Sequence, residues 1–304
     1  TGLEPPNSEI HKERGGGGKK KKLMASLCHL VVATVVLFLV ATCSSAYEDP
    51  AGTYCNPNSG IVPGGPVSDN IGLFVAGSAL AAQAGARFIS STYGEEENVV
   101  YGLAQCRGEL NETDCFDCIQ AAGDQIQKSC PNLSDAQIWY NYCTLRYSQH
   151  RFFGKFDTAN GVVLVRNPRN YPDPQALSDA LTDLFDGLNN VAVDPNGGGF
   201  AAGQTKLSDS DTLYGMAQCT KDLSSFACAE CLNAAMSEVE DYCGPSRGCR
   251  VFYSTCAVRY ELYTFIPHEI PNQAVEKLII RHEFPKAKQI HKLRSRKSMM
   301  ISSF

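Results

Sequence analysis

Fourteen cysteines are the residues of this sequence with the most definite chemistry. Cysteines at CxxC spacing, as at Cys115 and Cys118 or Cys228 and Cys231, can hold zinc, exchange disulfides or form structural bridges. No histidine is placed to complete a zinc cluster, and neither CxxC lies in the βαβ context of a redox motif. In an exported chain disulfides are the default. The pattern therefore predicts structural disulfides and no metal site.

The amino-terminal residues indicate export. A lysine run at 19–22 precedes an apolar stretch at 30–40 and the small residues Ser44-Ser45-Ala46, which is the order of a secretory signal. A membrane anchor is the alternative, but the apolar stretch is shorter than the ~18–20 residues that span a bilayer. We expect residues 1–23 to be a non-native extension before a start at Met24, and 24–46 to be a signal peptide. Its removal leaves twelve cysteines and no membrane span.

Two copies of one domain make up the rest of the chain. YGLAQC at 101–106 recurs as YGMAQC at 214–219, and five cysteines recur with a shift of 113 residues. Cys106, Cys115, Cys118, Cys130 and Cys143 correspond to Cys219, Cys228, Cys231, Cys243 and Cys256. This predicts domains at 47–160 and 161–266, joined near residues 167–174, where prolines interrupt regular structure.

Hydrophobic periodicity predicts the same elements in each copy. Leu177, Leu181, Leu184, Phe185 and Leu188 form one helical stripe, and the Ala-rich residues 71–88 are its counterpart. A second helix is expected after each CxxC, at 116–128 and 229–241. The stretches 138–148 and 251–265 are rich in Val, Tyr, Phe and Thr, as strands are. Each copy is thus an α+β domain, two helices packed on a small antiparallel sheet.

The motifs YGLAQCRGELNETDCFDC and YGMAQCTKDLSSFACAEC, with CAVRYELYTF at 256–265, resemble the plant cysteine-rich repeat secretory proteins. That family is built from ginkbilobin-type (stress-antifungal) domains, and the resemblance covers residues 50–266. It implies five strands in each sheet and three disulfides in each domain. Relatives continue into a membrane helix, with or without a kinase, whereas this chain has no apolar run after Phe265 and is similar to the secreted branch.

The resemblance also implies which cysteines pair. The implied pairs are Cys55–Cys130, Cys106–Cys115, Cys118–Cys143, Cys219–Cys228 and Cys231–Cys256. Cys243 lacks an amino-terminal partner, because Pro168 stands at the position 113 beyond Cys55. Cys249 has no counterpart in the first copy, where Ala136 occupies its place. We expect Cys243 and Cys249 to pair with each other.

Candidate ligand residues follow from the resemblance as well. In the ginkgo-seed relative, mannose is bound by an Asn directly after the first cysteine, an Arg six residues before the last cysteine and a Glu five residues after it. The first copy has Asn56, but Gln137 and Ser148 occupy the other two places. The second copy has Arg250 and Glu261, while Arg169 stands 113 residues beyond Asn56. Neither copy has all three on this alignment, and Arg250 and Glu261 can equally be a cross-strand ion pair.

Composition excludes further classes of function. Residues 47–266 hold 13 basic and 26 acidic residues, which disfavours nucleic acid as a partner. Nucleophile-elbow, HExxH and phosphate-loop motifs are missing, so we expect no catalytic residue, no cofactor and no enzyme, although a two-carboxylate glycosidase stays open. We predict a secreted, non-enzymatic binding protein of the apoplast, an interaction module in stress, defence or developmental signalling that binds an extracellular protein. The alternative is a lectin-like antifungal protein that binds mannose-type cell-wall or fungal glycan.

Two surface features complete the prediction. Asn111 and Asn132 begin N-glycosylation sequons. Residues 267–304 carry eight Lys or Arg with scattered apolar residues. We expect a basic, disordered tail there, with adhesion to the cell wall or a membrane as the alternative.

Overall fold

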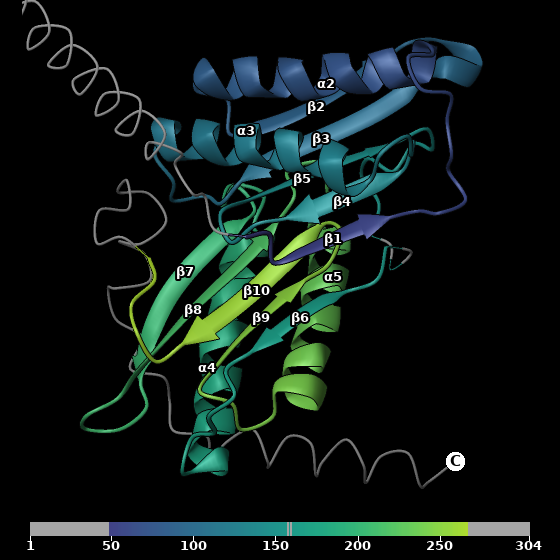
Figure 1. Cartoon of the computed structure of the whole chain (residues 1–304). Coiled ribbons are helices and arrows are strands. Elements are labelled where there is room, and N and C mark those ends of the chain that lie inside the picture. Colours follow the sequence, from purple (N-terminus) through teal and green to yellow (C-terminus); the bar gives the residue numbers. More distant parts are fainter. Residues whose placement is uncertain (1–48, 157, 159, 267–304) are drawn as a thin grey trace, which may run out of the picture. The chain divides into compact units, whose positions relative to one another are not determined.

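The structure is a computed structural model that describes residues 49–156, 158 and 160–266 (Figure 1). The predicted extension 1–23, signal peptide 24–46 and basic tail 267–304 lie outside the described residues.

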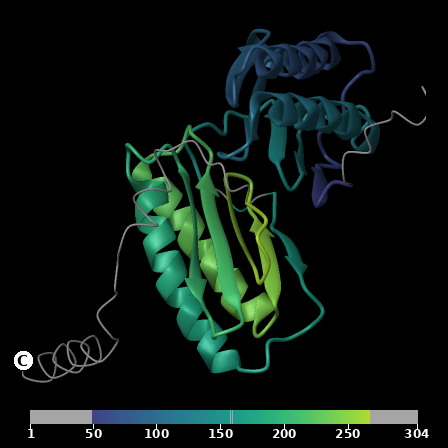
Figure 2. The ribbon, with the colours of Figure 1, turned by 90° about the vertical axis from the view of Figure 1, so that its left-hand side faces the viewer.

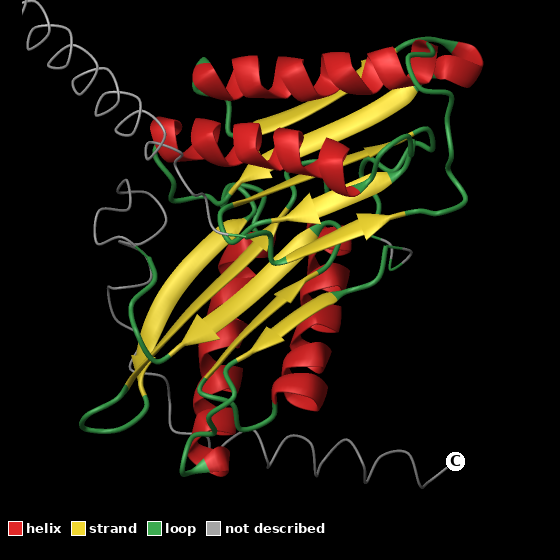
Figure 3. Cartoon of the chain, viewed as in Figure 1, coloured by secondary structure: helices red, strands yellow, loops and turns green. Residues whose placement is uncertain are grey.

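The first repeat is a five-stranded antiparallel sheet with strand order β1-β4-β5-β3-β2. Its elements are β1 (Gly52–Cys55), α2 (Pro66–Gln83), β2 (Phe88–Tyr93), a 3-10 turn (Glu96–Asn98), β3 (Val100–Cys106), α3 (Glu112–Ser129), β4 (Ala136–Trp139) and β5 (Cys143–Ser148). Helices α2 and α3 contact each other and the sheet, and they cover one of its faces (Figures 1 and 3).

The second repeat has the same topology, with strand order β6-β9-β10-β8-β7. Its elements are β6 (Val163–Arg166), α4 (Pro174–Val193), β7 (Phe200–Lys206), β8 (Thr212–Cys219), α5 (Ser225–Glu238), a π turn (Val239–Cys243), β9 (Gly248–Phe252) and β10 (Cys256–Glu261). Figure 2 shows α4 and α5 against one face of this sheet. The predicted fold class, two tandem α+β domains with two helices on five strands each, is confirmed.

The leucine stripe predicted for the second repeat is confirmed in α4. Leu177, Leu181, Leu184, Phe185 and Leu188 are all buried and form most of the helix's core face. Asp173 begins the helix by accepting a hydrogen bond from the backbone amide of Ala176, and Pro174 follows in the first turn, where its missing N–H costs nothing.

Boundaries of three predicted helices were wrong. Helices α3 and α5 begin before the CxxC motifs because Asn111 and Ser224 cap them, so both cysteines of each motif lie inside a helix. Helix α2 begins at Pro66, not at 71, and ends at Gln83, because Gly85 adopts a positive φ of 91° and turns the chain into β2.

The stretches 138–148 and 251–265, predicted to have strand composition, each contain residues of two paired strands. Tyr140–Tyr142 and Tyr253–Thr255 form the turns between paired strands. The predicted join at 167–174 was also wrong, because β6 already pairs with β9 and those prolines lie inside the second repeat.

Six disulfides connect the helices and strands, three within each repeat. They are Cys55–Cys130, Cys106–Cys115, Cys118–Cys143, Cys219–Cys228, Cys231–Cys256 and Cys243–Cys249. Five of these are the pairs that the resemblance implied, and the sixth, Cys243–Cys249, is the pair expected because each of its cysteines lacks a partner in the repeat pattern.

Candidate functional site

Strand register gives the second repeat an asparagine that the sequence alignment missed. Arg166 pairs with Cys249 as Cys55 pairs with Ala136, so Asn167 is the counterpart of Asn56. The Asn56 amide donates to the Asp135 carbonyl at 3.0 Å, and the Asn167 amide donates to the Gly248 carbonyl at 2.8 Å. The expectation that Arg169 fills this place was therefore wrong. The segment from Arg166 to Cys219 is two residues longer than the equivalent segment from Cys55 to Cys106, so the local shift is 111 and not 113.

Asn167, Gly248 and Glu261 form one row across three neighbouring strands. Gly248 pairs with Glu261 and accepts the Asn167 amide hydrogen bond, and residues directly opposite each other share a face of the sheet. Gly248 carries no side chain, and the carboxyl group of Glu261 lies over it, where a Cβ would collide. Arg250 stands two residues further along β9 on the same face, with its Nε 3.3 Å from Glu261 Oε1.

These side chains retain hydrogen-bonding capacity. Glu261 Oε1 accepts from Arg250 Nε and from Arg259 Nε and Nη2, at 3.1–3.3 Å, whereas no described residue donates to Oε2. Asn167 Oδ1 accepts from the Arg169 amide at 2.9 Å, and its Nδ2 has no acceptor among the residues that the structure covers. Arg250 donates through Nη1 to Asn141 Oδ1 at 2.7 Å and keeps a side chain that is 23% exposed. A carboxylate acceptor, an amide donor and a guanidinium donor thus share one face.

The equivalent side chains of the first repeat already make hydrogen bonds within the protein. Asn56 Nδ2 donates to Asp135 Oδ2 at 3.0 Å, and its Oδ1 accepts from the Asn58 amide. Gln137, in the place of Arg250, donates to the Ser254 carbonyl at 2.9 Å. Asn56 therefore stabilises a turn of the first repeat. It does not share a site with Arg250 and Glu261, the residues with which the resemblance grouped it.

Positive charge dominates around Glu261. Burial lowers the pKa of Arg259, and the neighbouring Arg250 lowers it further, while Glu261 opposes both effects. The Arg259 guanidinium also lies 4.1 Å from the centre of the Phe265 ring. Arg107 of the first repeat pairs with Glu109 and donates to the Phe265 carbonyl at 3.3 Å. Three guanidinium groups against two carboxylates make this cluster attractive to electron-rich oxygens.

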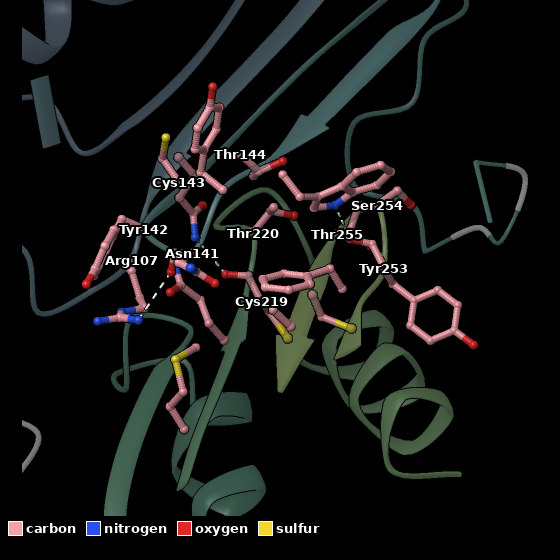
Figure 4. Close-up of a pocket in the computed structure, with 18 residues that line it drawn as sticks. Arg107, Asn141, Tyr142, Cys143, Thr144, Cys219, Thr220, Tyr253, Ser254 and Thr255 are labelled. Atoms are coloured by element: carbon pink, nitrogen blue, oxygen red, sulfur yellow. Dashed lines mark hydrogen bonds between the residues drawn. The ribbon is translucent and has the colours of Figure 1, made fainter. Parts of the chain in front are cut away.

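A small pocket lies where the repeats meet (Figure 4). Arg107, Asn141 and Tyr142 come to it from the first repeat, Tyr253 and Ser254 from the second, and Trp139 Nε1 donates to the Tyr253 carbonyl at 2.9 Å. Its volume is about 60 Å³. That is room for a few water molecules, against the roughly 300 Å³ or more of an ordinary ligand site. The pocket belongs to a packed contact.

Two glutamines make this contact reciprocal. Gln105 Nε2 donates to the Cys219 carbonyl at 2.9 Å, and Gln218 Nε2 donates to the Cys106 carbonyl at 3.0 Å. Their Oε1 atoms accept from the backbone amides of Lys221 and Gly108. Sequence reasoning missed both residues, although the glutamine before the cysteine in YGLAQC and YGMAQC was the signal that could have identified them.

Comparison with known proteins agrees with the doubled domain. The family described as "Salt stress response/antifungal" matches residues 54–150 and 165–263. The chain belongs to the salt stress response/antifungal family.

Relatives of this chain include proteins named as secretory and an ectodomain. It is 41% identical to cysteine-rich repeat secretory protein 55 of Arabidopsis thaliana, over 77% of this chain and 90% of that protein. It is 40% identical to an antimicrobial ginkbilobin-2-like protein of Castanea crenata, over 59% and 73% of the two chains. The tandem DUF26 ectodomain of the Arabidopsis thaliana receptor-like protein PDLP8 superposes with a TM-score of 0.62 at 26% identity, over 70% of this chain and 98% of that one.

Other predicted features can be placed in the fold. Asn111 is exposed at the start of α3 and Asn132 is exposed in the turn after Cys130, and their glycosylation stays a prediction. Across residues 49–266, apart from 157 and 159, no group of three or more His, Cys, Asp or Glu is arranged to hold a metal ion. No helix within this part of the chain is long and apolar enough to cross a membrane.

Proposed function

We propose that this protein is a secreted, non-enzymatic binding protein of the plant extracellular space, whose second repeat binds mannose-type sugar through Asn167, Arg250 and Glu261. One observation carries the proposal: Asn167 Nδ2 and Glu261 Oε2 have no partner among the described residues and lie on one face beside Arg250. Adjacent sugar hydroxyls each donate and accept, so a carboxylate oxygen between two N–H donors suits them.

The first repeat is a built-in comparison for this site. There the side chain of Asp135 occupies the amide donor of Asn56, whereas its counterpart in the second repeat is Gly248. Loss of that carboxylate releases the asparagine amide and leaves room above Gly248 for the Glu261 carboxyl group. The residue pattern of the ginkgo-seed protein supports the same class of ligand.

Asn167→Ala is the sharpest test, because this side chain otherwise holds only the turn at Arg169. We expect methyl mannoside, titrated into secreted protein and followed by NMR, to bind on the order of tenfold more weakly to this variant, the effect of one lost hydrogen bond. Asn56→Ala makes the same change in the first repeat and should leave the affinity unchanged. Equal binding by all three proteins, or no binding by the wild type, would contradict the sugar site.

A second candidate function, binding of an extracellular protein, is favoured by an apolar ridge on α2. Buried Ile71, Phe74, Ser78 and Ala82 match buried Leu181, Leu184, Leu188 and Ala192 of α4 with a shift of 110. On that alignment, Asp183 and Asn190 of the second repeat correspond to Leu73 and Leu80, which are 55% and 67% exposed. Exposed leucines where the sister domain carries polar residues are a surface suited to an apolar protein partner.

Leu73→Asp combined with Leu80→Asn gives α2 the polar residues of α4 and tests this candidate. With the secreted chain as bait in extracellular fluid, partners captured by the wild type should be lost from the variant, while methyl mannoside binding stays unchanged. Asp183→Ser is the control on the polar helix and should capture the same partners. Capture that survives the double substitution would remove the ridge as a binding surface.

A further inference from the structure

A larger cavity, of about 270 Å³, lies inside the second repeat. The end of α4, the loop that follows it, the segment after β8 and the first turn of α5 form its walls. Asn167, Arg250 and Glu261 are not among its lining residues. Its volume is close to the lower end of the range for small-molecule sites.

The first repeat has long charged side chains at two corresponding positions. Phe88 pairs with Gln105 as Phe200 pairs with Gln218, so Arg87 corresponds to Gly199. Glu112 and Ser225 are the first residues of α3 and α5. Arg87 Nη1 donates to the Gly108 carbonyl at 3.1 Å, and the Glu112 carboxyl group lies beside Gly85 in the turn before Arg87. The second repeat therefore lacks one guanidinium and one carboxylate in this region.

The walls of the cavity carry opposite charges. Lys221 and the start of α5 supply positive charge, and the first turn of α5 holds no acidic residue, whereas that of α3 holds Glu112 and Asp114. Asp194 and the end of α4 supply negative charge, and the last turn of α4 holds no basic residue. An ion of one sign would leave the opposite wall uncompensated.

Thr220 adds a polar group without a partner. It lines this cavity as well as the small pocket between the repeats, and the residue is only 5% exposed. Its hydroxyl oxygen makes no hydrogen bond with the described residues. A buried hydroxyl in this state is costly unless a ligand or water pairs with it.

From these observations we infer that the cavity binds a small zwitterion, such as an α-amino acid. Its carboxylate lies at the amino-terminal end of α5 beside Lys221, and its ammonium group lies toward Asp194 and the carboxyl-terminal end of α4. Together the two ends fill the space that the Arg87 and Glu112 side chains occupy in the first repeat, and Thr220 lines the same cavity. This site is independent of the proposed sugar site.

Titration with L-alanine and L-glutamine, followed by backbone-amide NMR, tests the inference. We expect saturable shifts at Gly198, Gly199, Lys221 and Ser225. N-acetylalanine and alaninamide each lack one of the two charges and should bind at least about tenfold more weakly. Ser225→Glu introduces the carboxylate that the first repeat carries and should abolish binding, while Ser237→Glu, the same change at the exposed far end of α5, should not.

Several results would overturn the inference. The first is an absence of saturable shifts with both amino acids. The second is that N-acetylalanine binds as tightly as L-alanine, which would make this a simple anion site. The third is unchanged amino-acid binding by a folded Ser225→Glu protein. Thr220→Val is a second test in case the Ser225→Glu protein does not fold. It replaces the hydroxyl by a methyl group of nearly the same shape, and it should weaken amino-acid binding several-fold. Unchanged amino-acid affinity in Thr220→Val would remove that residue's part in the site and refute the arrangement proposed. Methyl mannoside binding through Asn167 should stay intact throughout, so either site can fail separately.

Discussion

Removing the Cys55–Cys130 disulfide should destabilise the protein about twice as much as removing Cys243–Cys249. The first bridge joins cysteines 75 residues apart in sequence, and the second joins cysteines 6 apart. Chain-entropy arguments then assign about 4.5 kcal/mol to the long loop and about 2 kcal/mol to the short one. The Cys106–Cys115 bridge inside the long loop shortens it by 9 residues, which lowers the first value by only about 0.1 kcal/mol.

Burial does not account for this difference. Cys130, Cys243 and Cys249 are almost fully buried and Cys55 is half-buried, so removing the two sulfur atoms costs no more packing in the first repeat than in the second. The predicted difference of roughly 2 kcal/mol therefore reflects the length of chain that each bridge constrains in the unfolded state.

The comparison uses Cys55→Ala with Cys130→Ala and, separately, Cys243→Ala with Cys249→Ala, so that no free thiol can exchange. Urea unfolding gives each loss of stability, and amide hydrogen exchange assigns it to one repeat. A larger loss from the Cys243–Cys249 pair would refute the loop-length reasoning. Peptide mapping that joins Cys55 to Cys249 would refute the pairing itself.

Three further predictions follow from the contacts and the sequence. Gln105→Leu and Gln218→Leu each leave one backbone carbonyl and one backbone amide unpaired at the contact between the repeats. Each substitution should therefore lower the free energy of unfolding by about 1–3 kcal/mol. A much larger loss for one of the two would contradict the reciprocal contact. Burial raises the pKa of Tyr260, whose hydroxyl donates to the Ser246 carbonyl. As the pH rises, the unfolded state therefore releases this proton before the folded state does. The free energy of unfolding should be constant below about pH 10 and fall above it, and it should fall less steeply in Tyr260→Phe. An equal fall in the wild type and in Tyr260→Phe would exclude Tyr260 as the source. A fusion of residues 24–304 should be exported with Tyr47 at its new amino terminus, and carbonate-resistant membrane retention would identify 30–40 as an anchor.

The repeat and the fold class were predictable because the sequence marks them more than once. Five cysteines share a single shift of 113 residues, and the α4 leucines follow one helical period. Each pattern rests on several residues, so a wrong assignment at one position does not change it. The starts of α3 and α5 were predicted four residues too late. The CxxC motif set the predicted boundary, whereas the capping residues Asn111 and Ser224 set the real one. The hairpin turn at Tyr140–Tyr142 carries aromatic residues that read as strand, and only pairing separates β4 from β5.

The candidate site was less predictable, for a different reason. Arg250 and Glu261 flank Cys256, one of the cysteines that fix the alignment, whereas β6 has no cysteine to anchor it. A two-residue difference in the connections was enough to move the match from Asn167 to Arg169. Only the hydrogen bonds between strands reveal such a slip, because they set which residues stand opposite each other. The hydrogen-bond partners that distinguish Asn167 from Asn56 likewise depend on tertiary structure.

The reciprocal glutamine bonds have the form of a contact in a twofold-symmetric dimer, in which each subunit offers the other the same residues. Here one chain carries both halves, so the linker keeps them at a high effective concentration and the pairing no longer depends on how much protein is present. A true homodimer must accept every substitution twice, once on each side of its axis. A covalent pair is free of that constraint, and one half can keep Asp135 against Asn56 while the other replaces the carboxylate with Gly248. Tandem duplication thus allows one half to serve as scaffold while the other acquires new binding chemistry.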